Sequence, residues 1–192
     1  MRKIILASRS KARRKLLKSA GFKFKVVESR ARESRILKRR TSDLVIGNAL
    51  RKAKSVAARF DSGIVIGADT VVLAGKKIIG KPKNIKDAFT HLKLLAGRPQ
   101  WVYTGLAVID IDNNKIFTAH DKTKVYMRAL SDEQIKNYFK RVSPLEKAGS
   151  FDVQGPDRRM FIDRIKGSFD NVVGLPIKKL AKILKKIDPD FR

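Results

Sequence analysis

The hydrophobic positions of this 192-residue chain form short apolar runs that alternate with amphipathic stretches. Runs rich in β-branched residues predict strands, and apolar residues three or four positions apart predict helices. Helices are expected to start near Ser10, Thr41 or Ser42, Asn84, Ser131 and Pro176. Strands are predicted at residues 3–7, 22–27, 64–75, 76–79, 101–111, 115–119 and 122–128. This alternation indicates an α/β domain with a mixed sheet.

The strand predicted at residues 64–75 carries a carboxylate, Asp69, within a run of β-branched residues. A buried carboxylate is costly without a compensating group, so Asp69 should meet a cation, a metal ion or a ligand. The alternative interpretation is that Asp69 ends the strand and caps a turn. The local pattern supports the two interpretations about equally.

Two hydroxyl groups and an arginine follow the first predicted strand. Ser8, Ser10 and Arg13 lie at the start of the next helix, with Ser10 as its expected N-cap. Free backbone N–H groups, the positive end of the helix dipole and a guanidinium group together suit a phosphate. An ordinary capped helix with a basic face is the alternative, and the position at a strand end favours the phosphate site.

Lys52 falls on the inward face of the helix that starts near residue 41, whose apolar stripe is Val45, Ala49, Val56 and Phe60. A lysine at such a position either extends its ammonium group to water at the edge of the core or points at an anion in a cleft. The first arrangement is the commoner one. Sequence alone leaves both open.

Three further polar residues lie in segments without a clear helix or strand pattern. Glu33 stands among arginines, where a solvated ion pair is the ordinary outcome. Lys81 precedes Pro82, which restricts its backbone. Gln154 ends a loop rich in small residues; its amide can bond a base edge, or the segment is simply a loop between strands.

Composition narrows the classes of protein. The 45 Lys and Arg residues against 18 Asp and Glu give a net charge of +27, which favours polyanionic partners such as nucleotides or nucleic acid. Adaptation of the surface charge to a basic proteome or to high salt is the alternative explanation, and it is the favoured one. The absence of cysteine excludes disulfides and thiolate metal sites. No apolar run is long enough for a membrane span or signal peptide, which predicts a cytoplasmic protein.

Familiar catalytic patterns are missing from the sequence. The histidines His91 and His120 are isolated and show no metal-binding spacing. We find no glycine-rich loop of the Walker type and no Ser/His/Asp constellation.

Taken together, the motifs resemble the Maf family of nucleoside triphosphate pyrophosphatases. Individually each match is weak, but their order and spacing are specific and extend from about Ile4 to Leu184. The matching segments are Ser8-x-Ser10 with Arg13-Arg14; Glu33; Lys52-Ala53; Gly67-Ala68-Asp69-Thr70; Gly80-Lys81-Pro82; Thr104-Gly105; Lys147-Ala148-Gly149 with Gln154-Gly155; and Gly174-Leu175-Pro176.

The resemblance implies a single domain over residues 1–192, with an elongated mixed sheet, flanking helices and two lobes around a central cleft. This fold is shared with inosine triphosphate pyrophosphatases. The implied activity is hydrolysis of a nucleoside triphosphate, dTTP, UTP or a modified pyrimidine nucleotide, to the monophosphate and pyrophosphate. It is assisted by a divalent metal cation, Mg²⁺ or Mn²⁺. A homodimer is compatible with the resemblance.

The resemblance also assigns roles around the reacting phosphate. Asp69 would be the general base or a metal ligand that orients the attacking water, and Glu33 would help to hold the metal. Lys52 and Lys81 would neutralise phosphate oxygens. Phosphoryl chemistry needs this kind of positioning and charge neutralisation.

Substrate recognition is assigned to five other positions. Ser8, Ser10 and Arg13 would cradle the phosphates, while Thr70 and Gln154 match positions associated with dTTP and UTP. The chain departs from the family at Ala12, which replaces an arginine tied to specificity, so the base preference is less well defined than the chemistry. A non-enzymatic protein that binds nucleic acid or a cell-division partner through its basic surface is the alternative function.

Overall fold

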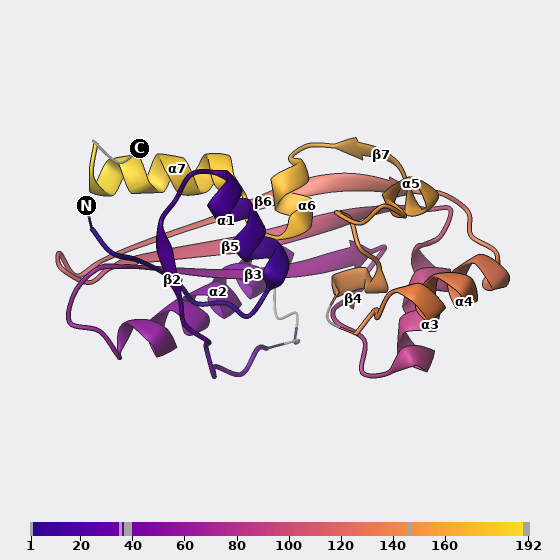
Figure 1. Ribbon diagram of the computed structural model, residues 1–192, viewed down its shortest axis with the longest axis horizontal. Coiled ribbons are helices and arrows are strands. Elements are labelled where there is room, and N and C mark those ends of the chain that lie inside the picture. The colour runs from indigo at the N-terminus through magenta and orange to yellow at the C-terminus, as the bar shows by residue number, and fades with distance from the viewer. Residues whose placement is uncertain (1, 35, 37–39, 146, 190–192) are drawn as a thin grey trace. The chain divides into compact units, whose positions relative to one another are not determined.

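The structure is a computed structural model that describes residues 2–34, 36, 40–145 and 147–189. Its strands form one mixed sheet in the order β2-β1-β3-β5-β6-β7, and β4 pairs with β3 (Figure 1). The first strand pairs in parallel with β2 and β3, whereas β3–β4 and β6–β7 are antiparallel. The strands are β1 (Ile4–Leu6), β2 (Phe24–Val26), β3 (Ile64–Ala74), β4 (Lys77–Ile79), β5 (Pro99–Asp110), β6 (Lys115–Met127) and β7 (Ile162–Lys166).

Helices flank this sheet, which confirms the predicted α/β class. They are α1 (Lys11–Ser19), α2 (Thr41–Ala57), α3 (Ile85–Leu95), α4 (Asp132–Arg141), α5 (Arg158–Phe161), α6 (Phe169–Val173) and α7 (Ile177–Ile187), with a 3-10 helix, η1, at Ala148–Ser150. None of the helices in the described part of the chain combines the length and apolar character needed to cross a membrane.

The chain divides into two compact units. The first comprises the described residues of 1–69, 104–121 and 173–192, and the second comprises those of 70–103 and 122–172. The three long strands β3, β5 and β6 contribute residues to both units. Asp69 is the last residue of its segment in the first unit.

In the first unit, successive residues of each strand point to opposite faces of the sheet and build two cores. Ile66 and Leu106 pack on one face against Leu17 of α1 and Leu180 of α7. On the other face, α2 packs against β1, β3 and β5 through Ala49, Ala53 and Val56. Figure 1 shows α7 and α2 on opposite sides of the strands.

Two glycines bring α2 very close to the sheet. A Cβ atom on Gly67 of β3 would lie 2.3 Å from the carbonyl oxygen of Ala49, and one on Gly105 of β5 would lie 2.3 Å from that of Val45. Any side chain at either position would push the helix away. The closeness of α2 to β3 is therefore set by glycine two residues before Asp69.

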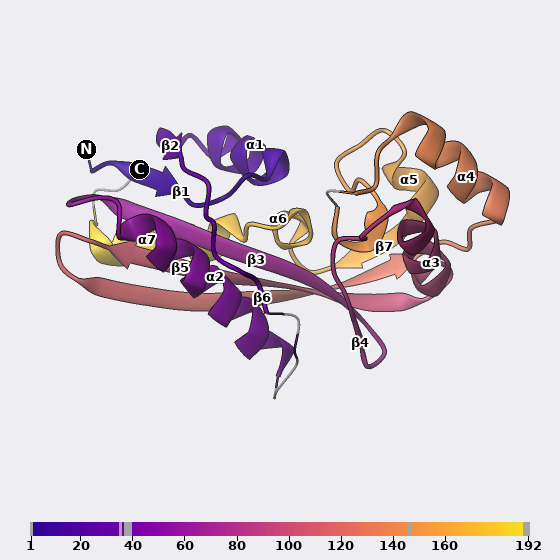
Figure 2. The ribbon, with the colours of Figure 1, turned by 90° about the horizontal axis from the view of Figure 1, so that it is seen from below.

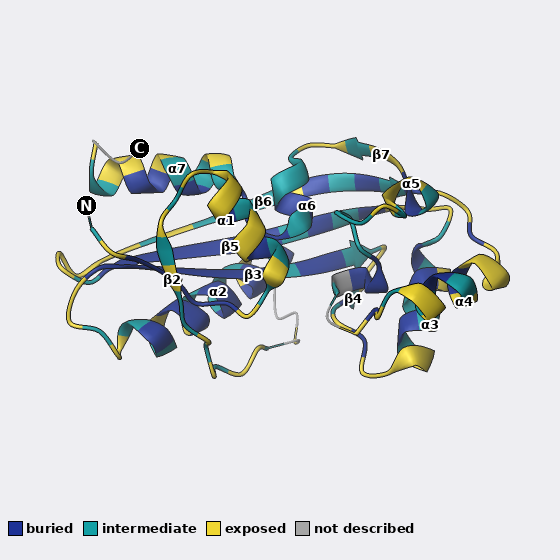
Figure 3. Cartoon of the chain, viewed as in Figure 1, coloured by how far each residue is buried: buried dark blue, intermediate teal, exposed yellow. Residues whose placement is uncertain are grey.

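The core of the second unit lies between the sheet and the helices α3, α4 and α5. Val102 of β5 and Val125 of β6 pack with residues of these helices, and Figure 3 shows the buried positions in dark blue. Three aromatic rings meet at its centre. The ring centroid of Phe161 lies 4.6 Å from that of Tyr138 and 5.3 Å from that of Phe151. This core supports the loop that carries η1.

Most predicted elements are present, with a few corrections. The strands predicted at 115–119 and 122–128 form one continuous strand, β6. The two polar residues between them bind Lys179 of α7, whose Nζ lies 2.6 Å from the carbonyl oxygen of His120 and 3.2 Å from the carboxylate of Asp121, and this stabilises the extended backbone there. The N-cap of α2 is Arg40, without a side-chain bond, rather than Thr41 or Ser42. Phe60 follows the end of α2 and still packs on its core. The helices α5 and α6 had no recognised sequence signal.

A partly buried ion pair joins the start of the chain to the end of β5. The guanidinium group of Arg2 donates to the carboxylates of Asp110 and Asp112, with its Nη1 3.0 Å from Asp110 Oδ2. Asn113 Nδ2 donates to the same carboxylate oxygen at 2.8 Å. The bonds from Arg2, with those from Asn113, lower the pKa of Asp110 to about 2.

This pair predicts a loss of stability in acid. Because the folded-state pKa of Asp110 lies below its ordinary value, its contribution is present above about pH 4 and disappears as the pH falls towards 2. We expect the pair to contribute about 1–2 kcal/mol at neutral pH. Urea unfolding of wild type and Arg2→Met at pH 7 and pH 3 measures it: the difference between the two proteins should shrink at pH 3.

The matched control removes an arginine from an exposed pair. Arg9 lies 3.1 Å from Glu28, and both side chains are more than half exposed. Arg9→Met should change the free energy of unfolding little at either pH. An Arg2→Met effect that is the same at pH 7 and pH 3 would contradict the assignment to Asp110.

Candidate functional site

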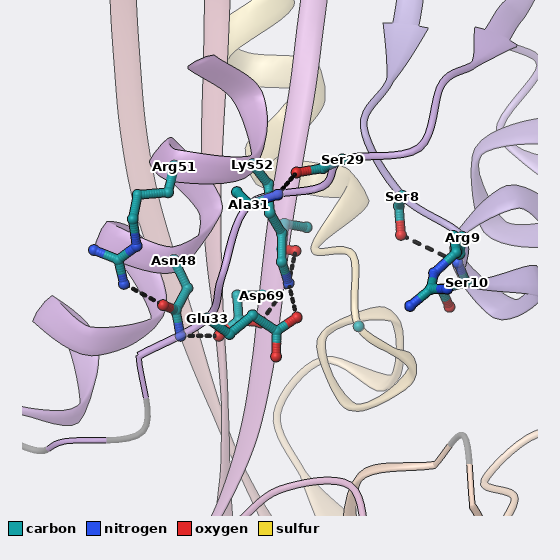
Figure 4. Close-up of polar contacts among 12 residues, drawn as sticks. Ser8, Arg9, Ser10, Ser29, Ala31, Glu33, Asn48, Arg51, Lys52 and Asp69 are labelled. Atoms are coloured by element: carbon teal, nitrogen blue, oxygen red, sulfur yellow. Dashed lines mark hydrogen bonds and ion pairs between the residues drawn. The ribbon is translucent and has the colours of Figure 1, made fainter. Parts of the chain in front are cut away.

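The centre of the candidate site is the carboxylate of Asp69 on β3. Only 4% of this residue is exposed. Lys52 Nζ lies 2.7 Å from Asp69 Oδ1, and Asn48 Nδ2 donates to Oδ2 at 2.8 Å (Figure 4). The strand continues to Ala74, so the interpretation that Asp69 ends it is wrong. The expected compensation of the buried charge is supplied by two side chains of α2.

The ammonium group of Lys52 bridges two carboxylates. It lies 2.6 Å from Glu33 Oε1 as well as 2.7 Å from Asp69 Oδ1, and it donates to the carbonyl of Ala68 at 3.3 Å. Lys52 is itself buried, so its ammonium group points at anions and does not extend to bulk water. Glu33 is 42% exposed, which places this carboxylate at the accessible side of the arrangement.

Asn48 is a site residue that the sequence analysis missed. Its side chain is buried and bonds to the backbone of Ser34 in both directions: the Ser34 N–H donates to Oδ1 at 2.8 Å, and Nδ2 donates to the Ser34 carbonyl at 3.0 Å. Because Nδ2 also donates to Asp69, Asn48 fixes the segment next to Glu33 against β3. The available signal was its spacing of four residues before Lys52, which places both on one helix face.

The two carboxylates form an oxygen-only donor set. Glu33, from a loop, and Asp69, from β3, both contact the ammonium group of Lys52, so their carboxylates face a common point. Within the described residues no group of three or more His, Cys, Asp and Glu side chains surrounds such a point. Carboxylates in this number fit Mg²⁺ or Mn²⁺, which keep several waters or take further oxygens from phosphate.

The predicted phosphate segment has the expected form. Ser10 caps α1 by accepting a bond from the Arg13 N–H at 3.3 Å, and the Ser10 N–H donates to Ser8 Oγ at 3.2 Å. The first turn of α1 contains no acidic residue. The segment therefore combines a helix N-terminus with two hydroxyl groups, of which that of Ser8 is buried, and a helix N-terminus suits an anion.

The guanidinium group of Arg13 is buried and ties three segments together. Its Nε donates to the Gly174 carbonyl at 2.7 Å, and its Nη1 donates to the Ala68 carbonyl at 2.9 Å and to Ser8 Oγ at 3.4 Å. Burial lowers the pKa of Arg13, an effect opposed by the charges of Asp69 and Glu33. Arg13 thus supports the backbone immediately before Asp69, a role the sequence did not predict.

The remaining predicted residues, Thr70, Lys81 and Gln154, belong to the second unit. Lys81 is exposed, and the carbonyl of Gly80 before it accepts a bond from the Gly149 N–H at 3.3 Å. The Gln154 N–H donates to Asp152 Oδ1 at 2.9 Å. The Lys81 segment and the loop that ends in Gln154 are therefore joined through their backbones.

A Ser, His and Asp contact, absent from the sequence analysis, strengthens this junction. Ser150 Oγ lies 3.3 Å from His91 Nδ1, and His91 Nε2 lies 3.3 Å from Asp87 Oδ1. Asp87 in turn accepts a bond from the Lys83 N–H at 2.9 Å. Ser150 is fully buried and holds a positive φ of 68°. A nucleophile must be reachable by substrate, so we interpret this contact as a link between η1 and α3.

Comparison with known proteins finds a matching family and similar full-length relatives. The chain matches the family described as Maf-like protein over residues 3–187. It is 44% identical over 187 residues to the dTTP/UTP pyrophosphatase of Methanosarcina barkeri, covering 97% of this chain and 94% of that protein. It is 42% identical to the dTTP/UTP pyrophosphatase of Dictyoglomus turgidum, covering 97% of both chains.

A solved structure shares the fold. The Staphylococcus aureus Ham1 protein aligns with a TM-score of 0.52 over 97% of this chain and 100% of that one, at 14% sequence identity. The family match extends over nearly the whole chain, and the M. barkeri relative is covered over 94% of its own length. The chain belongs to the Maf family.

Proposed function

We propose that the protein hydrolyses a pyrimidine nucleoside triphosphate, dTTP or UTP, to the nucleoside monophosphate and pyrophosphate. The observation that carries the proposal is the buried Asp69 carboxylate, which Lys52 and Asn48 hold in place. Glu33, which is more exposed, contacts the same Lys52 ammonium group. The names of the curated relatives support the substrate class. A carboxylate held in this way is positioned for chemistry on a water molecule.

In the proposed reaction, the oxygen of a water molecule attacks the α-phosphorus of the triphosphate. The bond from that phosphorus to the oxygen bridging to the β-phosphate breaks, and pyrophosphate leaves with that oxygen. Asp69 accepts a proton from the water as the new P–O bond forms, and the proton then passes to solvent. Asn48 and Lys52 keep the carboxylate in one orientation during this step.

Glu33 and Asp69 are the residues that would hold a divalent cation, Mg²⁺ or Mn²⁺. Such an ion, when bound, neutralises phosphate oxygens and lowers the pKa of a coordinated water. The cation would share the two carboxylates with Lys52, whose ammonium group contacts both. Lys52 would turn towards the phosphate oxygens when a cation takes its place on the two carboxylates, which is the role that the resemblance assigns to it.

The other roles stay proposals on the same basis. Ser8 and Ser10 bind phosphate oxygens at the start of α1, and Lys81 contributes a second positive charge. Thr70 and Gln154 recognise the base. A homodimer and a location in the cytoplasm are predictions from the sequence that accompany this activity.

A nucleotide panel tests the proposal. We expect the purified protein with Mg²⁺ or Mn²⁺ to release one pyrophosphate per dTTP or UTP, measured with a coupled pyrophosphate assay, and to act more slowly on dGTP, dATP and GTP. Addition of EDTA should stop the release. Absence of pyrophosphate release from every triphosphate in the panel would refute the proposed function.

A further inference from the structure

The second unit carries a sheet face on which aromatic rings alternate with cations. We call it the basic aromatic face, and it consists of Trp101 on β5, Lys122, Lys124 and Tyr126 on β6, and Arg164 on β7. Lys122 Nζ lies 5.3 Å from the centre of the Trp101 ring, and Lys124 Nζ lies 5.6 Å from it. On the next ring, Lys124 Nζ lies 5.4 Å and Arg164 Cζ 4.3 Å from the centre of Tyr126.

The pleat of the sheet explains why these side chains share a face. Alternate residues of the same strands, Val102, Thr123 and Val125, are buried, and the two valines pack in the core under the helices. The pairing register places Tyr126 opposite Arg164, and Lys124 opposite Lys166. Figure 2 shows α3, α4 and α5 together on one side of β5 and β6, so the basic aromatic face is on the other side.

Charge and exposure make this face suited to a polyanion with flat rings. Trp101, Lys124 and Tyr126 are partly exposed, and Lys122 and Arg164 are exposed. Every charged member of the face is a cation, in a chain with a net charge of +27. Aromatic side chains on an open sheet stack with unpaired bases, while neighbouring lysines and arginines contact the phosphates between them.

We propose that the basic aromatic face binds single-stranded nucleic acid. The bases of a duplex are stacked on one another and cannot reach the aromatic rings, so a duplex would contact only the cations through its phosphates. Single strands should therefore bind more tightly than duplexes of equal length. The basic helix α7 provides a contrast. It exposes Lys178, Lys182, Lys185 and Lys186, and no residue of α7 itself is aromatic, so the helix offers charge without a ring for stacking.

The test uses Trp101, the single tryptophan of the chain. Titration of the full-length protein with a thymidine oligonucleotide of about 15 nucleotides at near-physiological salt should quench its fluorescence and saturate at micromolar concentration. A saturating non-hydrolysable UTP analogue should leave this binding in place, which separates the face from the nucleotide site. The pyrophosphate assay tests the proposed hydrolysis separately, and its failure would not change the oligonucleotide binding measured here.

Matched variants locate the binding surface. Lys122→Gln/Lys124→Gln should weaken binding of a labelled oligonucleotide about tenfold, whereas Lys182→Gln/Lys185→Gln, which removes the same charge from α7, should change it less than about twofold. Trp101→Phe should retain most of the affinity, and Trp101→Ala should lose about tenfold or more.

Three outcomes would overturn the proposal. The first is an equal loss of binding in the two lysine pairs, which would indicate charge alone. The second is a preference for heparin or duplex over the single strand. The third is a response of Trp101 to vesicles containing phosphatidylglycerol but not to the oligonucleotide, which would assign the face to an anionic membrane surface.

Discussion

Asp69→Asn is expected to lower the rate of pyrophosphate release from dTTP or UTP by about 10²–10⁴-fold, the range typical of losing a general base. The amide has nearly the shape of the carboxylate, and Lys52 keeps its contact with Glu33 at 2.6 Å. The fold should therefore persist while the proton acceptor and a metal ligand are lost. Initial rates at saturating nucleotide, together with a thermal unfolding curve of each protein, measure the effect.

Asp110→Asn is the matched control for this variant. Asp110 is also a buried carboxylate on a central strand of the same unit, paired with Arg2. Its substitution should reduce the thermal stability and leave the rate per folded molecule close to wild type. If Asp69→Asn retained wild-type turnover, or if Asp110→Asn lost as much activity while folded, Asp69 would have no special place in the reaction.

The features that sequence could predict are those fixed by local pattern. The run around Asp69 is rich in β-branched residues, so a buried strand whose carboxylate needs a partner could be proposed from sequence, although a turn cap was equally supported. The caps at Ser10, Asn84 and Ser131 are also local, since each side chain bonds a backbone N–H three residues ahead. These elements occur as predicted.

The features that sequence could not predict depend on contacts between distant residues. Nothing near Arg13 indicates that its guanidinium group bonds the carbonyl of Gly174, 161 positions later. The link of Ser150 to His91 spans 59 positions and joins two residues that look isolated along the chain. Lys52 is an intermediate case: its inward position was visible, but the choice between water and an anion required the location of Glu33 and Asp69.

Gly67→Ala is expected to produce the second large effect, although glycine at residue 67 touches neither nucleotide nor metal in the proposed reaction. The added Cβ would lie 2.3 Å from the Ala49 carbonyl oxygen, 2.9 Å from Ala53 N and 3.0 Å from Ala53 Cβ. Two of these atoms belong to the helix backbone, so relief requires α2 to move as a whole. Overpacking of this kind costs about 1–3 kcal/mol, and backbone contacts place the expected loss at the upper end.

The same movement should remove activity because α2 carries both partners of Asp69. Lys52 Nζ and Asn48 Nδ2 lie 2.7 and 2.8 Å from its oxygens. A shift of about 1 Å would lengthen both distances beyond those of a hydrogen bond. Misplacement on this scale costs about 10²-fold in rate. We therefore expect Gly67→Ala to lower both the midpoint of thermal unfolding and the turnover measured well below that midpoint.

Gly47→Ala provides the control within the same helix. A Cβ at this position meets only Arg51 Nη1, at 3.6 Å, so it is accommodated, and alanine in a helix interior is favoured over glycine by about 1 kcal/mol. This variant should unfold at a higher temperature than wild type and retain its activity. Equal stability losses in the two variants would show that flexibility, rather than the approach of α2 to β3, explains glycine at residue 67. A stable Gly67→Ala protein with full activity would contradict the argument that this approach positions Lys52 and Asn48 on Asp69.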